Sequence, residues 1–314
     1  MKRFTLKCGA LLLALAAIIY LGGVAYRHTN HYRNLEYAEE TVKFYRVPAG
    51  IDIAVFGSSH GRNAFQYAPT GKTMFNFSMS SQTPQYDEKM MLQFADRFHE
   101  GTLIILTMSY FSPFWTDDEE TFNSKQERYY RVLDASNIVN VDEEKYYLQK
   151  FSPLLTEDIT SLVAAFLKNE PLNAFDTDDK IFSEEHEESE RERILRNHLT
   201  FKESGNYPGG NPVMMDAFRD ILTMSRQNGW QSVLVTPPYT DVYNECFSDD
   251  FYPAFYARVE ELTKEFDVPY LDYSHDVRFA SNYDLFQDID HLNATGAEKF
   301  DEIFFADLAQ LQYE

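Results

Sequence analysis

The chain has 314 residues, 44% of them hydrophobic and 16% aromatic, so it is long enough to bury a sizeable core. Its formal net charge of -22 excludes a general nucleic-acid-binding function, because neutralising phosphates requires clustered Lys and Arg. The same charge disfavours tight docking on an anionic membrane surface. Polyanionic substrates are not excluded, since a local pocket can differ in charge from the whole molecule.

An apolar segment near the N-terminus predicts a membrane anchor. Residues 1–7 form a basic tip that contains Lys2, Arg3 and Lys7, and the run from residue 8 to residue 26 carries no charge. About 20 apolar residues cross a bilayer, and positive charge before such a run keeps the N-terminus in the cytoplasm. We therefore expect a single-pass protein of the cell membrane, with residues 27–49 as a juxtamembrane linker and the rest extracytoplasmic.

A cleaved signal peptide is the alternative interpretation of this segment, with the remaining chain secreted. The residues Gly23, Val24 and Ala25 are a poor match to the small-x-small pattern of a cleavage site. Both interpretations export the remaining chain. An uncleaved anchor is the interpretation that the segment's length favours.

The two cysteines, Cys8 and Cys246, are too few for a disulfide framework in the exported part, because Cys8 lies in the apolar run. No Cys/His spacing typical of a metal site occurs in the chain. The sequence therefore predicts neither a metal nor another cofactor.

Short apolar runs alternate with helical patterns over residues 50–314, which predicts one α/β domain. The expected strands are residues 52–56, 73–77, 102–107, 232–236 and 269–273. Uninterrupted apolar runs are typical of strands buried on both faces of a parallel sheet. The expected helices between and after them are residues 86–99, 212–227, 252–266 and 297–311. This order predicts a doubly wound, mostly parallel five-stranded sheet.

Residues 117–208 interrupt this alternation. They are rich in acidic and aromatic residues, and they predict a mostly helical insertion between the third and fourth strands. The acidic run from Glu184 to Glu192 is expected to be the solvated face of a helix. A calcium site is disfavoured, because the spacing of oxygen ligands around a central glycine is absent.

A Gly-Ser turn follows the first predicted strand, in the segment Gly57-Ser58-Ser59-His60. Ligands of open α/β sheets bind outside the carboxyl ends of the strands. A glycine permits a sharp turn there, and a serine at the start of the next helix presents its hydroxyl and its backbone N–H to the site. Taken alone, such a segment more often only caps a helix.

A histidine with neighbouring carboxylates precedes the last predicted helix. His291 is the candidate base for Ser59, and Asp288 is the candidate carboxylate that orients its imidazole. Asp290 is expected to point elsewhere. Loop and capping roles are the alternative for these acidic residues. A sugar-nucleotide and metal motif of the Asp-x-Asp type is disfavoured, because no nucleotide-binding segment accompanies it.

Together the two segments resemble the SGNH (GDSL-like) hydrolase superfamily, in its branch of membrane-anchored, exported bacterial proteins. That branch includes the D-alanyl-transfer protein of teichoic acid modification and the alginate acetyltransferases. Gly57-Ser58-Ser59 matches the first block, with Ser59 at the nucleophile position, and Asp288-x-x-His291 matches the last block. The resemblance implies the SGNH/flavodoxin-like three-layer fold and a Ser-His-Asp triad that needs no cofactor.

The two middle blocks depart from the superfamily pattern. Ser80 and Ser81 stand where the second block usually offers an oxyanion glycine, and the third strand ends at Ser109 instead of a Gly-x-Asn-Asp block. A backbone N–H of Ser80 or Ser81 is the expected substitute. His60 and Tyr239 are further candidate pocket residues, with ordinary packing as the alternative for both.

These patterns predict an extracytoplasmic serine esterase or O-acyltransferase that acts on an acylated cell-envelope glycan through an acyl-enzyme. The expected partners are this ester substrate, the membrane and an envelope-polysaccharide machinery, and nucleic acid is not expected. A catalytically degenerate, SGNH-like scaffold of such a machinery is the alternative, because the usual glycine and asparagine are missing. A carbohydrate-binding module is a third interpretation, supported only by the abundance of aromatic residues.

Overall fold

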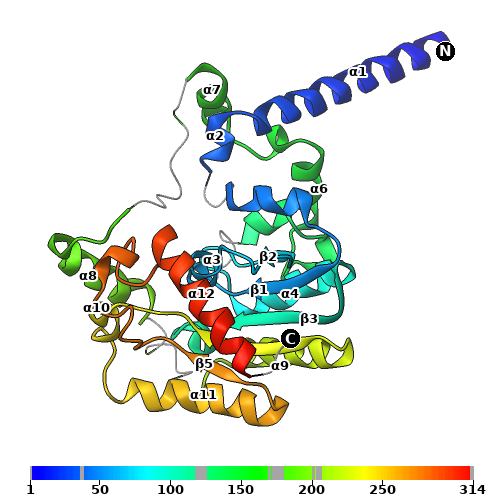
Figure 1. Ribbon diagram of the computed structural model, residues 1–314. Helices are drawn as coiled ribbons and strands as arrows, with labels where there is room; N and C mark the ends of the chain where they lie inside the picture. Colours follow the sequence, from blue (N-terminus) through cyan, green and yellow to red (C-terminus); the bar gives the residue numbers. More distant parts are fainter. Residues whose placement is uncertain are drawn as a thin grey trace. The chain divides into compact units, whose positions relative to one another are not determined.

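The computed structural model describes residues 2–35, 39–116, 126–168, 171, 180–199, 202 and 207–311. The chain divides into two compact units, which are drawn together in Figure 1. The N-terminal unit comprises residues 1–46 and 119–175, and the α/β unit comprises residues 47–118 and 176–314. The predicted insertion is thus divided between the two units. Its acidic start at residues 117–120 lies outside the described residues.

The N-terminal unit begins with α1 (Lys2–Arg27), a helix of 26 residues. The most apolar window of this helix has a mean hydropathy of 2.3, and most of its side chains are exposed. The helix is long and apolar enough to cross a membrane. It starts before the apolar run, so the basic tip is helical too.

Short helices surround the C-terminal end of α1 within this unit. They are α2 (Asn30–Arg33), η1 (Glu39–Arg46), η4 (Glu127–Arg131), η5 (Ala135–Asn137), α6 (Glu143–Phe151), η6 (Pro153–Leu155) and α7 (Ile159–Leu167). The close approach of α1 and η6 depends on Gly23, where a Cβ would lie 2.3 Å from Ser152 Oγ. Ser152 Oγ in turn donates a hydrogen bond to the carbonyl of Ile19 at 2.9 Å.

The α/β unit is built on a five-stranded sheet. Its strands are β1 (Ile51–Phe56), β2 (Met74–Asn76), β3 (Phe98–Thr107), β4 (Gln231–Thr236) and β5 (Tyr270–Asp272). Their order in the sheet is β2-β1-β3-β4-β5, and every pair is parallel. The central strands are buried on both faces, as their apolar runs predict. The α/β prediction is confirmed, with a wholly parallel sheet.

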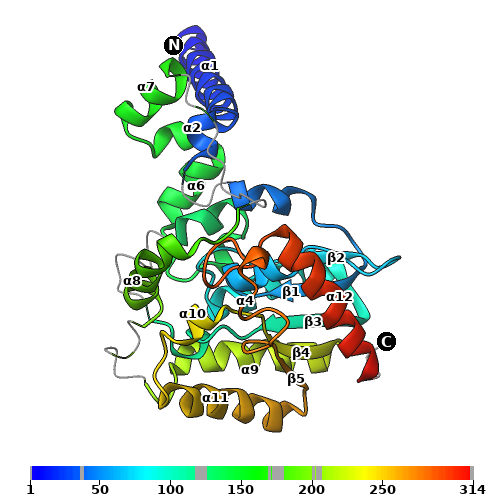
Figure 2. The ribbon, with the colours of Figure 1, turned by 60° about the vertical axis from the view of Figure 1, so that its left-hand side comes forward.

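Two groups of helices flank the sheet (Figure 2). The helices α3 (Ser59–Ala64) and α12 (Ala294–Gln310) contact each other. The helix α9 (Pro212–Gln227) contacts both α4 (Pro84–Phe94) and α11 (Phe251–Phe266). The chain moves one way from β1 to β2 and the other way from β2 onward, so right-handed crossovers place α3 on the face opposite α4, α9 and α11.

The remaining described helices of this unit are short and lie around the ends of the strands. They are η2 (Ala95–Arg97), η3 (Ser112–Phe114), η7 (Glu184–His186), α8 (Glu187–Asn197), α10 (Asp241–Asn244) and η9 (Tyr283–Leu285). Most acidic side chains of the run from Glu184 to Glu192 are exposed, as predicted for a solvated helix face.

The helix predicted over residues 86–99 is wrong at its C-terminal end. α4 ends at Phe94, a short 3-10 turn follows, and β3 already begins at Phe98. Phe98 packs edge-on against Trp230 at 5.0 Å and Phe77 at 5.7 Å between ring centroids, so its side chain belongs to the core of the sheet. The predicted helix 212–227 is confirmed, and the side chain of Asn211 caps it by accepting from the Val213 N–H at 3.0 Å.

The turn after β1 depends on Gly57. Its φ of 144° is a backbone conformation that side chains rarely adopt, and a Cβ there would lie 1.6 Å from Thr107 Oγ1. Thr107 cannot withdraw without cost, because its hydroxyl donates to the carbonyl of Phe56 at 2.9 Å. Two independent constraints therefore require glycine at this position.

We expect Gly57→Ala to destabilise the α/β unit by about 3 kcal/mol or more, since it adds overpacking to backbone strain. Gly50→Ala is the matched control. Gly50 also has a positive φ, of 67°, but no atom lies within 4 Å of its Cβ position, so only the backbone cost of about 1 kcal/mol applies. Tryptophan fluorescence during urea unfolding measures both, because Trp115 and Trp230, the chain's two tryptophans, belong to this unit. Equal losses of unfolding free energy in the two variants would contradict the close approach of Gly57 to Thr107.

Candidate active site

Two loops meet at the carboxyl edge of the sheet and carry the predicted site residues. Ser58 lies in the extended N-cap position of α3, and Ser59 is the first residue of that helix. The second loop precedes α12, and Asn293 caps this helix by accepting from the Gly296 N–H at 2.9 Å. The Asn293 amide also donates to the carbonyl of Asp284 at 2.8 Å, which ties the loop to η9.

The structure brings Ser59, His291 and Asp288 into one hydrogen-bonded chain. His291 Nε2 lies 2.8 Å from Ser59 Oγ, and His291 Nδ1 lies 2.9 Å from each carboxylate oxygen of Asp288. Because an ionised carboxylate only accepts, Nδ1 carries the hydrogen. The lone pair of Nε2 is then directed at the Ser59 hydroxyl. All three residues are partly exposed.

The backbone holds the carboxylate of Asp288 in place. Its Oδ1 accepts from the N–H of His291 at 2.8 Å and from the N–H of Asp290 at 3.1 Å. The three-residue spacing between Asp288 and His291 allows one tight turn to supply both the side-chain contact and these backbone donors. The orienting carboxylate is therefore fixed by the local chain.

Carboxylates surround the imidazole of His291. Burial lowers its pKa, but the charges of Asp288 and Asp290 outweigh this and raise the pKa of His291 above its ordinary value of 6.5. Asp290 Oδ1 lies 3.5 Å from His291 Nδ1. The imidazolium that forms when His291 takes a proton is thus stabilised by two negative charges.

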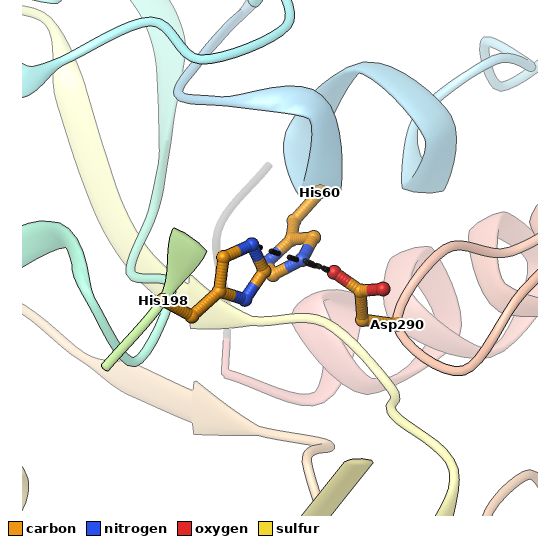
Figure 3. A group of neighbouring side chains, drawn as sticks. All are labelled: His60, His198 and Asp290. Carbon is orange, nitrogen blue, oxygen red and sulfur yellow. Dashed lines mark hydrogen bonds and ion pairs between the residues drawn. The ribbon is translucent and has the colours of Figure 1, made fainter. Parts of the chain in front are cut away.

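A second group lies beside this chain, and the buried Asp290 is its centre (Figure 3). Asp290 Oδ2 accepts from His60 Nε2 at 2.9 Å, and its Oδ1 pairs with the guanidinium of Arg193 on α8. His198 Nε2 lies 3.8 Å from the same carboxylate. Burial raises the pKa of Asp290, but Arg193 and His291 overcome this and hold it well below its ordinary value of 3.8.

The hydrogen bond to Asp290 fixes the tautomer of His60. Since Nε2 donates to the carboxylate, Nδ1 of the neutral ring is an acceptor, and the hydroxyls of Tyr239 and Ser109 each lie 2.9 Å from it. Burial lowers the pKa of His60 despite the neighbouring carboxylate, which keeps the ring neutral. Ser58 Oγ continues the network, 3.1 Å from Ser109 Oγ.

Three of the predicted pocket residues are interior residues. His60, Ser109 and Tyr239 are each at most 2% exposed, and their polar atoms face one another. In this conformation they support the turn that carries Ser59, whereas none of them is open to a substrate.

Ser80 and Ser81 lie in the loop after β2 and are half-buried. Ser81 has a φ of 52°, the left-handed conformation that glycine adopts most easily. The Met79 N–H donates to the carbonyl of Gly57 at 3.3 Å, so this loop lies against the turn after β1.

A buried acid lies beneath the same turn. Burial raises the pKa of Asp87 to about 7, although hydrogen bonds from the Gln82 side chain and the Gly57 backbone oppose the shift. The amide of Gln82 donates to Asp87 at 2.7 Å and to the carbonyl of Phe77 at 3.1 Å. These bonds connect α4, the loop after β2 and the turn that holds Ser59.

The sequence analysis missed Arg193 and His198. Arg193 lies in the second half of α8 and His198 directly after it, both beyond the acidic run from Glu184 to Glu192 that was expected to be a solvated face. His198 Nδ1 lies 3.0 Å from the hydroxyl of Tyr243, and burial lowers the pKa of His198 well below 6.5. The sequence offered one indirect signal, because a carboxylate buried beside a histidine needs a cation. No local pattern indicates which arginine supplies it.

The donor atoms of His60, His198 and Asp290 all lie within 4.8 Å of one another, and so do those of Asp288, Asp290 and His291. Such donor types suit a divalent metal. The guanidinium of Arg193 already pairs with Asp290 and would repel a second cation there. We therefore interpret the group as an ion-pair network.

No family model and no curated protein matches this chain. Two groups of side chains make up the candidate site. One is the partly exposed chain from Ser59 to Asp288, and the other is the network around the buried Asp290.

We expect Arg193→Gln to destabilise the α/β unit by about 3 kcal/mol, because the change leaves the Asp290 carboxylate buried without its cation. This is the lower end of the usual range, since the Arg193 side chain is 27% exposed. Arg196→Gln is the matched control on the same helix. Its side chain is 66% exposed and pairs with the similarly exposed Glu192, so we expect a loss below about 0.5 kcal/mol. Urea unfolding followed by tryptophan fluorescence distinguishes the two, and similar losses would show that the Arg193 pair is not structural.

Proposed function

We propose that the chain is an SGNH-type serine esterase or O-acyltransferase that acts on an acylated cell-envelope glycan. The observation that carries the proposal is the chain of hydrogen bonds from Ser59 through His291 to Asp288, with distances of 2.8 and 2.9 Å. The order of nucleophile, base and orienting carboxylate is that of a serine-hydrolase triad. The strand order 2-1-3-4-5, with the site at the carboxyl edge, also supports it.

The first half of the reaction forms an acyl-enzyme. Ser59 Oγ attacks the carbonyl carbon of the ester while His291 Nε2 takes the hydroxyl proton, and Asp288 stabilises the imidazolium through Nδ1–H. The tetrahedral intermediate then breaks the bond to the glycan oxygen. His291 returns the proton to that oxygen, so the glycan leaves as an alcohol and the acyl group stays on Ser59.

The second half transfers the acyl group to water or to a sugar hydroxyl. His291 takes a proton from this acceptor, whose oxygen attacks the acyl carbonyl. When the intermediate collapses, Ser59 Oγ leaves and recovers its proton from His291. Water as acceptor makes the protein an esterase, and a sugar hydroxyl makes it an acyltransferase.

The oxyanion of both intermediates needs hydrogen-bond donors near Ser59. The Ser59 N–H at the start of α3 has no partner within its helix, because the first N–H groups of any helix lack one. The loop with Ser80 and Ser81 is the candidate for the second donor, since it lies against Gly57 and turns through the left-handed conformation of Ser81. Backbone donors require no particular side chain, so serine can replace the usual glycine.

The proposed cellular place follows from α1. An uncleaved α1 would anchor the protein, and the basic residues before its apolar run favour an extracytoplasmic α/β unit. A substrate attached to the envelope would then lie on the same side of the membrane as Ser59. This topology supports a glycan ester over a cytoplasmic metabolite.

One observation favours the alternative of a catalytically degenerate scaffold. Ser109 stands where the superfamily has an Asn-bearing block, and its hydroxyl lies within hydrogen-bond distance of both Ser58 and His60 in a fully buried position. A scaffold of this kind would keep the fold and the membrane anchor without turning over an ester. Covalent labelling separates the two functions.

We expect a fluorophosphonate probe to label the full-length protein in detergent, and Ser59→Ala to abolish the label. Hydrolysis of p-nitrophenyl acetate should fall by about 1000-fold or more in the same variant, as for other triad nucleophiles. Ser58→Ala is the control: Ser58 is 2% exposed and its hydroxyl lies 3.1 Å from Ser109 Oγ, so labelling should persist. Folded protein that takes no label, or labelling that survives Ser59→Ala, would favour the scaffold.

The pH dependence of this hydrolysis should report on His291. Only neutral His291 accepts a proton, and its pKa is raised, so kcat/KM should rise with pH through a midpoint above 6.5. Asp290→Asn removes a charge that raises this pKa, and the midpoint should move down. Arg193→Gln removes a charge that lowers it, and the midpoint should move up. If the pH midpoint of both variants equalled that of the wild type, His291 would be excluded as the titrating base.

A further inference from the structure

A cavity of about 670 Å³ lies within the N-terminal unit, at the C-terminal end of α1. Residues of α1, α2, η1, η4 and α6 line it, among them Val24, Arg27, Tyr32, Arg131 and Lys150. Its volume is within the range of ordinary small-molecule sites. The cavity belongs to neither the triad nor the network around Asp290.

The cationic residues that line this cavity include Arg27, Arg131 and Lys150. Within the described part of the chain, no carboxylate forms an ion pair with Arg27, Arg131 or Lys150. Arg27 instead donates to the carbonyls of Gln149 at 2.8 Å and of Lys150 at 3.0 Å, which holds its guanidinium at the end of α6. In a chain with 50 acidic and only 28 basic residues, such a cluster is a marked local departure.

Arg131 is the most constrained of these cations. Its guanidinium lies over the ring of Tyr32, 4.6 Å from the centroid. Its Nη1 is buried and has no hydrogen-bond partner among the described residues. A buried cationic donor without an acceptor is costly, and a bound anion would satisfy it.

Two acids near the cavity do little to neutralise this cluster. Glu39, which lines the cavity, is paired with Arg33 at 2.9 Å. Burial raises the pKa of Glu157 although Arg131 opposes this, so the charged form of this acid is disfavoured. The cavity therefore favours an anionic ligand.

The surroundings of the cavity indicate where that ligand comes from. The apolar run of α1 ends at the cavity, so a membrane crossed by α1 would bring lipid headgroups to its level. The neighbouring helix α7 contacts α1 and presents apolar side chains outward: Ile159 is 80% exposed, Leu167 80% and Phe166 52%. Such a face beside a membrane-spanning helix is typical of a helix that lies in the lipid interface.

We propose that this cavity binds the phosphate of an anionic membrane lipid, with Arg27, Arg131 and Lys150 as the cationic contacts and α7 resting in the acyl boundary. Guanidinium groups bind phosphate oxygens through two parallel hydrogen bonds, which suits a headgroup phosphate. The proposal is independent of the triad. Binding of an anionic lipid is compatible with the net charge of -22, because the charge of this local cluster is positive.

Native mass spectrometry of the full-length chain in detergent tests the proposal, with phosphatidylglycerol and phosphatidylcholine as probes. We expect the wild type to bind phosphatidylglycerol at least 10-fold more tightly. The variant Arg131→Gln/Lys150→Gln should weaken this binding by about 10-fold or more, since each cation near a phosphate contributes about 1 kcal/mol. Lys145→Gln is the matched control. It removes the same charge from α6, but Lys145 pairs with Glu127 and does not line the cavity.

Three results would overturn the proposal. They are equal affinity for the two lipids, an equal loss in Lys145→Gln, and full displacement of phosphatidylglycerol by millimolar inorganic phosphate or glycerol phosphate, which would indicate a site for a free phosphate. Lys150→Gln alone guards against misfolding of the double variant, because Lys150 is exposed and its replacement removes little packing. Lys150→Gln alone should weaken the binding of phosphatidylglycerol about 5-fold.

Discussion

The buried charge of Asp290 is the constraint on which the carboxyl edge of the sheet depends. A buried carboxylate must be paired and hydrogen-bonded, and here the carboxylate and its two partners come from three separate segments. His60 comes from α3, Arg193 from α8, and Asp290 itself from the loop before α12. Because the same carboxylate joins all three segments, it constrains their mutual positions. Ser59 and His291 are immediate neighbours of His60 and Asp290.

The two polar groups at this edge of the sheet have different roles. In the network around Asp290, the carboxylate and His60 are buried and hydrogen-bonded to each other, so this network provides rigidity. The chain from Ser59 to Asp288 is partly exposed and ends on a hydroxyl that is free to react with an ester in the proposed reaction. The charge of Asp290 links the groups, because it contributes to the raised pKa of His291.

The two compact units have contrasting surfaces. The α/β unit presents acidic faces such as that of α8, whereas the N-terminal unit gathers cations around one cavity and exposes apolar side chains on α7. The chain's strong negative charge thus describes most of its surface without describing every part of it. If α1 crosses a bilayer, the cationic and apolar groups of the N-terminal unit lie close to lipid.

Local patterns were sufficient for the strands, most helix boundaries and the candidate triad. Asn211 and Gly229 marked the ends of a helix through capping chemistry, which acts over a few residues. Ser59, Asp288 and His291 were identifiable because each follows a predicted strand or precedes a predicted helix at one edge of a parallel sheet. The C-terminal end of α4 could not be predicted in this way. Phe98 has helical spacing, but its contacts with Trp230 and Phe77 place it in the sheet.

Only the tertiary structure decided which groups surround the triad. Arg193 lies 97 residues before Asp290 in the chain, and the acidic stretch around it has the pattern of any solvated helix. The cavity at the end of α1 likewise combines residues near position 30 with residues near positions 130 and 150. Periodicity and spacing describe how a segment meets its own neighbours along the chain. Pairing of buried charges depends on which distant segments fold against each other, and a single sequence does not contain that information in any local pattern.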